Sequence, residues 1–157
     1  MNTNNGKNRI TVREATLAEH AVIAGFQVAM AAETEDLALD RAVVERGVRE
    51  VFRRPELGKY YVAVKDDRLV ASLLITYEWS DWRNALVYWI QSVYVLPQER
   101  GRGVFRAMYG HIRDLVLTDE AVSGIRLYVD KNNRTAREVY RRLQMDGDHY
   151  ALYEWMK

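Results

Sequence analysis

The sequence predicts an α+β domain with a mixed, mostly antiparallel central sheet flanked by about four helices. Apolar segments of strand type follow one another in the middle of the chain, and segments with helical spacing stand before and after them. A length of 157 residues with 48% hydrophobic content suits one domain with a substantial core. We therefore expect a single domain over residues 9–157, after a flexible, asparagine-rich tail over residues 1–8.

The first third of the chain predicts one strand and two helices. Residues 9–14 are expected to form a short strand. Thr16 and Glu19 have the spacing of a capping box, so a helix should run from there to about residue 32. Asp40 belongs to the residue types that cap helices, and a second helical pattern follows it to about residue 53.

The rest of the chain predicts a meander of strands and then alternating elements. Polar turns separate three expected strands, which cover residues 60–64, 69–77 and 86–95. Apolar residues recur at helical spacing from Val104 through Met108, Ile112 and Leu115, so a helix begins at about residue 104. A strand over 125–129, a helix over 135–143 and a terminal strand over 149–155 complete the predicted order.

Composition excludes several classes of function. Lys and Arg total 23 against 22 Asp and Glu, so the net charge of +1 gives no overall attraction to nucleic acid or to an anionic membrane. The chain has no cysteine, and its three histidines lack the spacing of a metal helix, so no metal site is expected. No apolar run is long enough to span a membrane. We expect a cytoplasmic protein.

The most informative segment joins the strand that ends near Val95 to the helix that begins near Val104. It contains a proline and then Gly101 and Gly103, which allow backbone conformations closed to other residues. The helix start provides unpaired N–H groups and the positive end of a dipole. Arg100 and Arg102 add positive charge. The segment therefore predicts a site for a phosphorylated ligand.

Two common phosphate motifs do not fit this turn. A P-loop requires Gly-Lys followed by Ser or Thr, which the chain lacks, and a dinucleotide fingerprint requires glycine where Arg106 stands. The remaining pattern, Gln98-x-x-Gly101-x-Gly103, resembles the acyl-CoA pyrophosphate turn of the GNAT superfamily of N-acetyltransferases. A second segment resembles the family's next cofactor region: Leu127-Tyr128-Val129 followed by Asn133, Ala136 and Tyr140.

This resemblance covers nearly the whole chain and implies acetyl-CoA as the donor substrate. It implies a pyrophosphate site at Gln98, Arg100, Gly101, Arg102, Gly103 and Val104, with further cofactor contacts from Asn133 and Tyr140. It implies that the backbone of Val93, Tyr94 and Val95 pairs with the pantetheine arm, and that an N–H on this strand faces the thioester oxygen. The family often has Gly-Phe soon after the tyrosine, where this chain has Gln144-Met145.

Acetyl transfer needs a neutral amine, a stabilised oxyanion and a proton for the departing thiolate. The resemblance implies that Tyr140 is the general acid, and donation from tyrosine to a thiolate is uphill by only about 2 kcal/mol. Freeing a lysine-like amine at pH 7 costs about 4.6 kcal/mol, so a base is useful. We consider the acidic residues near the first helix end, Glu33 and Glu35, and also Glu78, and favour Glu35 and Glu78.

Structural roles are the alternatives at each of these positions. Asn133 is also a favoured helix cap, Tyr140 could pack on the sheet, and any one carboxylate could be a solvated surface charge. An aromatic group from Tyr77 to Trp89 could form sheet core, contact an acceptor or line a homodimer interface. For the chain as a whole, the leading function is acetylation of a small-molecule or peptide amine. A catalytically inactive acyl-CoA sensor is the alternative, and a nucleic-acid module has little support.

Overall fold

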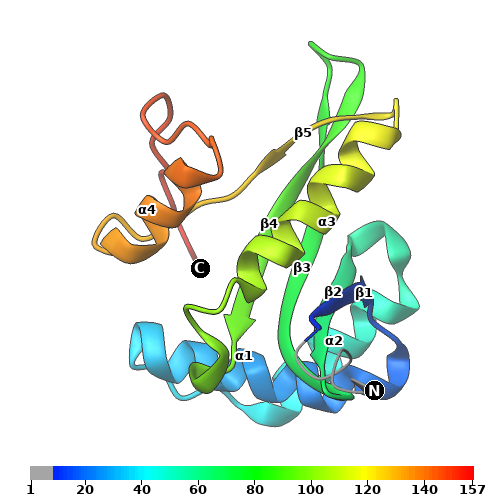
Figure 1. Cartoon of the computed structure of the whole chain (residues 1–157), viewed down its shortest axis with the longest axis vertical. Coiled ribbons are helices and arrows are strands. Elements are labelled where there is room, and N and C mark those ends of the chain that lie inside the picture. The colour runs from blue at the N-terminus through cyan, green and yellow to red at the C-terminus, as the bar shows by residue number, and fades with distance from the viewer. Residues whose placement is uncertain (1–8) are drawn as a thin grey trace, which may run out of the picture. The chain divides into compact units, whose positions relative to one another are not determined.

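The computed structural model of the chain describes residues 9–157 (Figure 1). Contacts divide the chain into two compact units, one ending at Arg126 and the other formed by Leu127–Lys157. The tail predicted for residues 1–8 lies outside the described residues, and the single domain stays a prediction. Within residues 9–157, no helix is both long and apolar enough to cross a bilayer.

The first unit is built on a five-stranded sheet whose strands follow chain order, β1-β2-β3-β4-β5. The first three pairs are antiparallel, and β4 and β5 are parallel. The strands are β1 (Thr11–Glu14), β2 (Lys59–Lys65), β3 (Arg68–Ser80), β4 (Ala85–Val95) and β5 (Val122–Arg126). With four α-helices in the described chain, the predicted α+β class is confirmed.

Helices cover both faces of this sheet. Tyr60 and Tyr61 are neighbours on β2, so their side chains point to opposite faces. Tyr60 stacks on Phe52 of α2 (Arg41–Arg53), with ring centroids 5.8 Å apart. Tyr61 contacts His111 of α3 (Val104–Thr118) at 5.6 Å. One face of the sheet therefore packs on α2 and its neighbour α1 (His20–Glu35), and the other packs on α3.

The predicted helix starts are confirmed. Thr16 and Glu19 form the capping box around a 3₁₀ turn, Leu17–Glu19, which continues directly into α1. Asp40 caps α2 by accepting the N–H groups of Ala42 and Val43 at 2.8 and 3.3 Å. In the capping box the Glu19 carboxylate accepts the N–H of Thr16 at 2.8 Å. At α2 the short side chain of Asp40 satisfies two N–H groups that the helix itself leaves unpaired.

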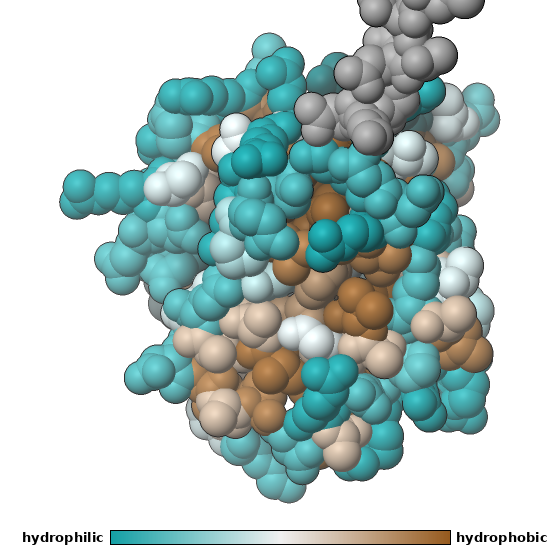
Figure 2. Space-filling model, turned by 60° about the horizontal axis from the view of Figure 1, so that its bottom comes forward, coloured by the Kyte–Doolittle hydropathy of each residue, from teal (hydrophilic) through white to brown (hydrophobic). Residues whose placement is uncertain are grey.

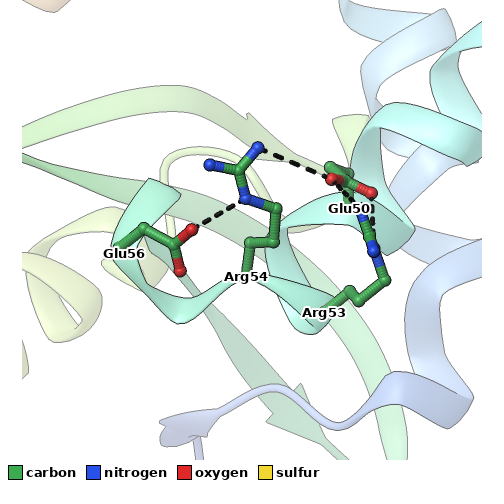
Figure 3. A network of polar contacts seen from close by, with 4 residues as sticks. All are labelled: Glu50, Arg53, Arg54 and Glu56. Atoms are coloured by element: carbon green, nitrogen blue, oxygen red, sulfur yellow. Dashed lines mark hydrogen bonds and ion pairs between the residues drawn. The ribbon is translucent and has the colours of Figure 1, made fainter.

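An exposed network of ion pairs lies at the C-terminal end of α2 (Figure 3). Glu50 accepts two hydrogen bonds from Arg53, at 2.5 and 2.9 Å, and lies 3.8 Å from Arg54. Arg54 also bonds Glu56 at 2.7 Å, in the 3₁₀ turn Pro55–Leu57. All four side chains are 36–73% exposed, so the network contributes little to stability.

Apolar side chains from both helix layers meet the sheet in the core. The predicted stripe on α3 is confirmed at Val104, Met108 and Ile112, which are fully buried or nearly so. The largest buried side chains of the other elements are Ile23, Val62, Leu73 and Ile75.

The strand predicted over residues 125–129 is wrong in its position, because β5 covers Val122–Arg126. Pairing with β4 begins at Leu86 and ends where Trp89 faces Arg126. Further along, β4 bulges at Ser92, whose φ is +51°, and the parallel ladder stops short of that irregularity. Leu127-Tyr128-Val129 therefore lies after the strand, among residues without regular secondary structure.

The terminal strand predicted over residues 149–155 is also wrong. The second unit contains one helix, α4 (Arg134–Arg142), and no strand. Alternating apolar residues produced the prediction, but a strand exists only where a partner completes its hydrogen-bond ladder. Without a ladder the large side chains of this segment are exposed: Tyr150 at 76%, Tyr153 at 93% and Trp155 at 87%.

Candidate functional site

β4 has an unpaired edge next to the glycine turn. On one side it pairs with β3 as far as Val95, and on the other it pairs with β5 only over Leu86–Trp89. Among residues 9–157, no strand pairs with the β5 side of residues 90–95. The buried side chain of Gln27, on α1, donates to the carbonyl of Ser92 at 3.3 Å, where the bulge leaves the regular ladder.

The hydrogen bonds at the end of β4 show which backbone groups face the unpaired edge. The N–H of Leu96 donates to Val70 at 2.9 Å, on the β3 side. Because backbone groups alternate in direction along a strand, the N–H and C=O of Val95 point to the unpaired edge. The carbonyl of Val95 accepts a bond from Arg100 Nε at 2.9 Å, which agrees with this direction. The N–H of Val95 remains as a donor on that edge.

The turn between β4 and α3 presents a group of backbone donors. Gly101 and Gly103 have φ of +72° and +80°, and Gly103 is the N-cap of α3 without a side-chain cap. The first backbone bond of the helix runs from Ala107 to Gly103 at 3.0 Å. Among the described residues, no acceptor receives the N–H groups of Gly101, Arg102, Gly103 or Val104. Unbonded donors at an uncapped helix start are the arrangement that the sequence predicts for binding an anion.

The two arginines of the turn have different surroundings. Arg100 Nη2 donates to Glu33 at 2.6 Å, and the hydroxyl of Tyr94 donates to the second oxygen of Glu33 at 2.9 Å. These bonds, that of Arg100 above all, lower the pKa of Glu33. Arg102 is 61% exposed and lies 3.8 Å from Glu99. Arg100 is thus tied to α1 and β4, while Arg102 extends from the turn.

A second ion pair attaches the turn to β2. Lys65 donates to Glu99 at 2.7 Å, and their side chains are only 9% and 15% exposed. The hydrogen bond from Lys65 is the main reason that the pKa of Glu99 is lowered. Glu99 immediately precedes Arg100, so adjacent residues of the turn are held by different elements.

The two predicted base candidates lie on separate elements. Glu78, on β3, accepts a hydrogen bond from Trp89 Nε1 at 2.5 Å and another from Arg126. These bonds, that of Trp89 first, lower the pKa of Glu78, which weakens it as a base. Glu35 is the last residue of α1 and is exposed, without a hydrogen bond to another described side chain.

The second unit holds Asn133 and Tyr140 on α4. Asn133 caps this helix, since its Oδ1 accepts the N–H of Ala136 at 2.9 Å. Burial raises the pKa of Tyr140. The chain turns after Tyr140 through Gln144, whose φ is +65°, and the N–H of Met145 returns to the Tyr140 carbonyl at 3.1 Å. A tight turn thus forms at Gln144 although no glycine stands there.

An apolar groove of about 440 Å³ runs between α1 and the end of β4. Phe26 and Tyr94 form part of its wall, with ring centroids 5.3 Å apart. Figure 2 views the side of the molecule on which α1 lies and shows apolar side chains gathered there. The remaining lining residues are Ala21, Val22, Gly25, Ala29, Arg41 and Leu96.

Metal-ligand side chains do not gather in the part of the chain that the structure describes. No group of three or more His, Asp or Glu residues there could hold a metal ion.

A model of the acetyltransferase (GNAT) family matches residues 20–145 of this chain. The chain therefore belongs to the GNAT acetyltransferase family, whose members are transferases that use acetyl-CoA. A solved structure described as a possible acetyltransferase from Clostridium difficile 630 is 40% identical, with a TM-score of 0.87 over 94% of this chain and 97% of that one. Among curated proteins, no match was found.

Two more distant structures share the fold. One is a predicted acetyltransferase with acetyl-CoA from Clostridium acetobutylicum, 16% identical, with a TM-score of 0.71 over 93% of this chain and 96% of that chain. Another is a ribosomal-protein-alanine N-acetyltransferase from Brucella melitensis biovar Abortus 2308, 13% identical, with a TM-score of 0.76 over 95% of this chain and all of the other.

Proposed function

We propose that this protein transfers the acetyl group of acetyl-CoA to a primary amine of a small molecule or peptide, by direct attack of the amine on the thioester. The observation that carries the proposal is that two features lie on adjacent segments of the chain. The turn over residues 98–104 offers unbonded N–H groups to an anion, and the β4 edge beside it has no strand partner. A CoA molecule has the matching parts, a pyrophosphate and an arm with amide groups.

The donor would lie with its pyrophosphate on the turn and its arm along β4. Backbone donors of Gly101, Gly103 and Val104 would hold the phosphates, with Gln98 and Arg102 at the rim. The arm would pair with the edge formed by Val93, Tyr94 and Val95, as an added strand does. The outward N–H of Val95 supports this arrangement, because it is a donor without a strand partner.

The chemistry needs one acid and one base. The amine nitrogen attacks the thioester carbon, the C–S bond breaks, and the thiolate takes a proton. We propose Tyr140 as the donor of this proton, because it stands where the family resemblance places the acid and a tyrosine hydroxyl is protonated at neutral pH. Burial raises its pKa further, so the hydroxyl holds its proton until the thiolate forms beside it. Among the carboxylates, the contacts favour Glu35 over Glu78 as base, because Glu78 already accepts bonds from Trp89 and Arg126.

The test is turnover with purified protein over a panel of amines. Release of free CoA thiol from acetyl-CoA should depend on one class of primary amine, and mass spectrometry should find the acetyl group on that amine's nitrogen. Tight CoA binding without turnover on any amine would contradict the enzyme and favour the alternative, an acyl-CoA sensor. Sedimentation of the same sample would test the predicted homodimer.

A further inference from the structure

The carboxylate of Glu33 joins three elements of the first unit. One oxygen accepts the hydroxyl of Tyr94, on β4, at 2.9 Å, and the other accepts Arg100 Nη2, in the turn, at 2.6 Å. Glu33 itself stands in the last turn of α1, 61 residues from Tyr94 and 67 residues from Arg100 along the chain. One side chain therefore fixes the end of α1 against both the strand and the turn.

Arg100 also contacts the unpaired edge of β4. Its Nε donates to the outward carbonyl of Val95 at 2.9 Å, and its guanidinium carbon lies 5.4 Å from the centroid of the Tyr94 ring. The guanidinium thus contacts a strand backbone group, an aromatic face and a carboxylate. This set of contacts defines the position of Arg100 relative to β4.

The turn depends on such outside contacts for its shape. Gly101 and Gly103 adopt left-handed conformations and have open space where a side chain would begin, so no neighbouring group packs at those points. On one side, Glu99 is bonded to Lys65 of β2 at 2.7 Å. On the other, Arg100 is bonded to Glu33. The two anchors hold the two residues that directly precede Gly101 and so limit the directions in which the N–H groups of the glycine segment point.

We infer that Glu33 is a positioning residue for the donor substrate: by holding Arg100 and Tyr94 it orients the backbone donors of residues 101–104 toward the pyrophosphate. This inference rests on the proposed CoA site. Its role is separate from that of the acid or base, because its two carboxylate oxygens are both engaged with protein donors. Removal of the Glu33 carboxylate should therefore weaken binding of CoA and leave the rate of the chemical step nearly unchanged.

The test compares Glu33→Gln with a matched variant, Glu50→Gln. Glu50 also lies in the last turn of its helix and binds two arginines, but its network is formed by α2 and the following turn (Figure 3). Isothermal titration with CoA should show about fivefold weaker binding for Glu33→Gln, as expected for loss of one exposed ion pair. Glu50→Gln should bind CoA as the unchanged chain does. Glu33→Asp, which keeps the charge, should recover part of the affinity.

Pantetheine, which has the arm but no phosphate, separates positioning of the turn from general damage. Binding of pantetheine, followed by NMR titration, should be the same for Glu33→Gln and the unchanged chain. Equal CoA affinity in both proteins would overturn the inference, as would an equal loss toward CoA and pantetheine. If the unchanged chain failed to bind CoA, the proposed function itself would be wrong, so the two failures are distinguishable.

Discussion

The chain contains two helix starts that resemble cofactor-binding segments, and the structure builds them by different means. α3 begins at an uncapped glycine and is held by buried side chains, with Val104 2% exposed and Met108 fully buried. No residue of α4 is fully buried, and the start of the helix is fixed by the Asn133 side chain. The first start leaves its backbone donors free for a ligand, whereas the second uses a side chain to satisfy a donor. We therefore expect the first segment to bind and the second to contribute mainly chemistry.

The largest predicted effect separates these two roles. Tyr140→Phe should lower kcat by about 10²-fold or more, the usual contribution of a general acid, and leave CoA affinity within about twofold. Because burial raises the pKa of Tyr140 above its ordinary value of 10.0, kcat should stay level through neutral pH and decline only as pH rises beyond that value. Stopped assays across pH and CoA titrations measure both quantities.

Tyr109→Phe, on α3, is the control for this substitution, because it removes a hydroxyl from the other helix. It should leave kcat and CoA affinity unchanged. An unaltered kcat in Tyr140→Phe would remove Tyr140 as the acid and, with it, the division of roles between the two segments.

A smaller effect is expected at the first segment. Gly103→Ala places a side chain at φ +80°, a conformation that costs about 1–2 kcal/mol without glycine. Since nothing lies within 4 Å of the added Cβ, the backbone conformation alone is responsible. Relaxation of the turn should weaken CoA binding by about tenfold, measured by titration.

Gly110→Ala is the matched control, because it adds the same atom within α3 where space is also open and φ is ordinary. It should raise stability slightly and leave CoA binding unchanged. If both variants bound CoA equally, the turn would not be the pyrophosphate site.

The sequence predicts those features of both segments that depend on neighbouring residues. The capping box at Thr16 and Glu19, the cap at Asp40 and the glycine turn all follow from short spacings. The contacts that hold the glycine turn do not follow from short spacings. Gln27 with Ser92, Lys65 with Glu99 and Glu33 with Arg100 are 65, 34 and 67 residues apart. In the sequence, each of these contacts is indicated only by a charged or amide side chain that has no partner nearby in the chain. Many surface residues have the same property, so it does not identify a contact.

The lack of long-range information also explains why the burial of some aromatic residues was not predicted correctly. Trp79 and Trp82 belong to the aromatic group for which sheet core was one expectation, but they are 59% and 88% exposed. Trp79 stands near the end of β3, and the turn that follows the strand carries Trp82. Tyr77 and Tyr88 do pair across the strands at 5.6 Å. Alternation indicates which side chains share a face, but it does not indicate which part of that face other elements cover.

A third prediction addresses the dependence of α4 on its cap. Asn133→Ala should cost about 1 kcal/mol locally and speed amide hydrogen exchange of residues 137–142, since no fully buried side chain holds the helix. Asp40→Ala removes a similar cap from α2, where Val48 is buried, and should leave exchange in the middle of that helix unchanged. If loss of the cap sped amide hydrogen exchange equally in α2 and α4, packing would not be the reason for a difference in stability between the two helices.

The smallest effect concerns the anchor of the first segment and its dependence on pH. Because Lys65 lowers the pKa of Glu99, the folded state holds this carboxyl ionised more firmly than the unfolded state does. Its stabilisation is therefore present above the unfolded pKa of about 4.3 and is lost as pH falls through the lower folded pKa. Chemical denaturation from pH 6 to 3 should show a shallower acid loss of stability in Lys65→Met than in the unchanged chain. Arg54→Met removes the partner of the exposed Glu56 and should follow the unchanged chain. Coinciding curves for Lys65→Met and the unchanged chain would mean that the turn is held by its other contacts alone.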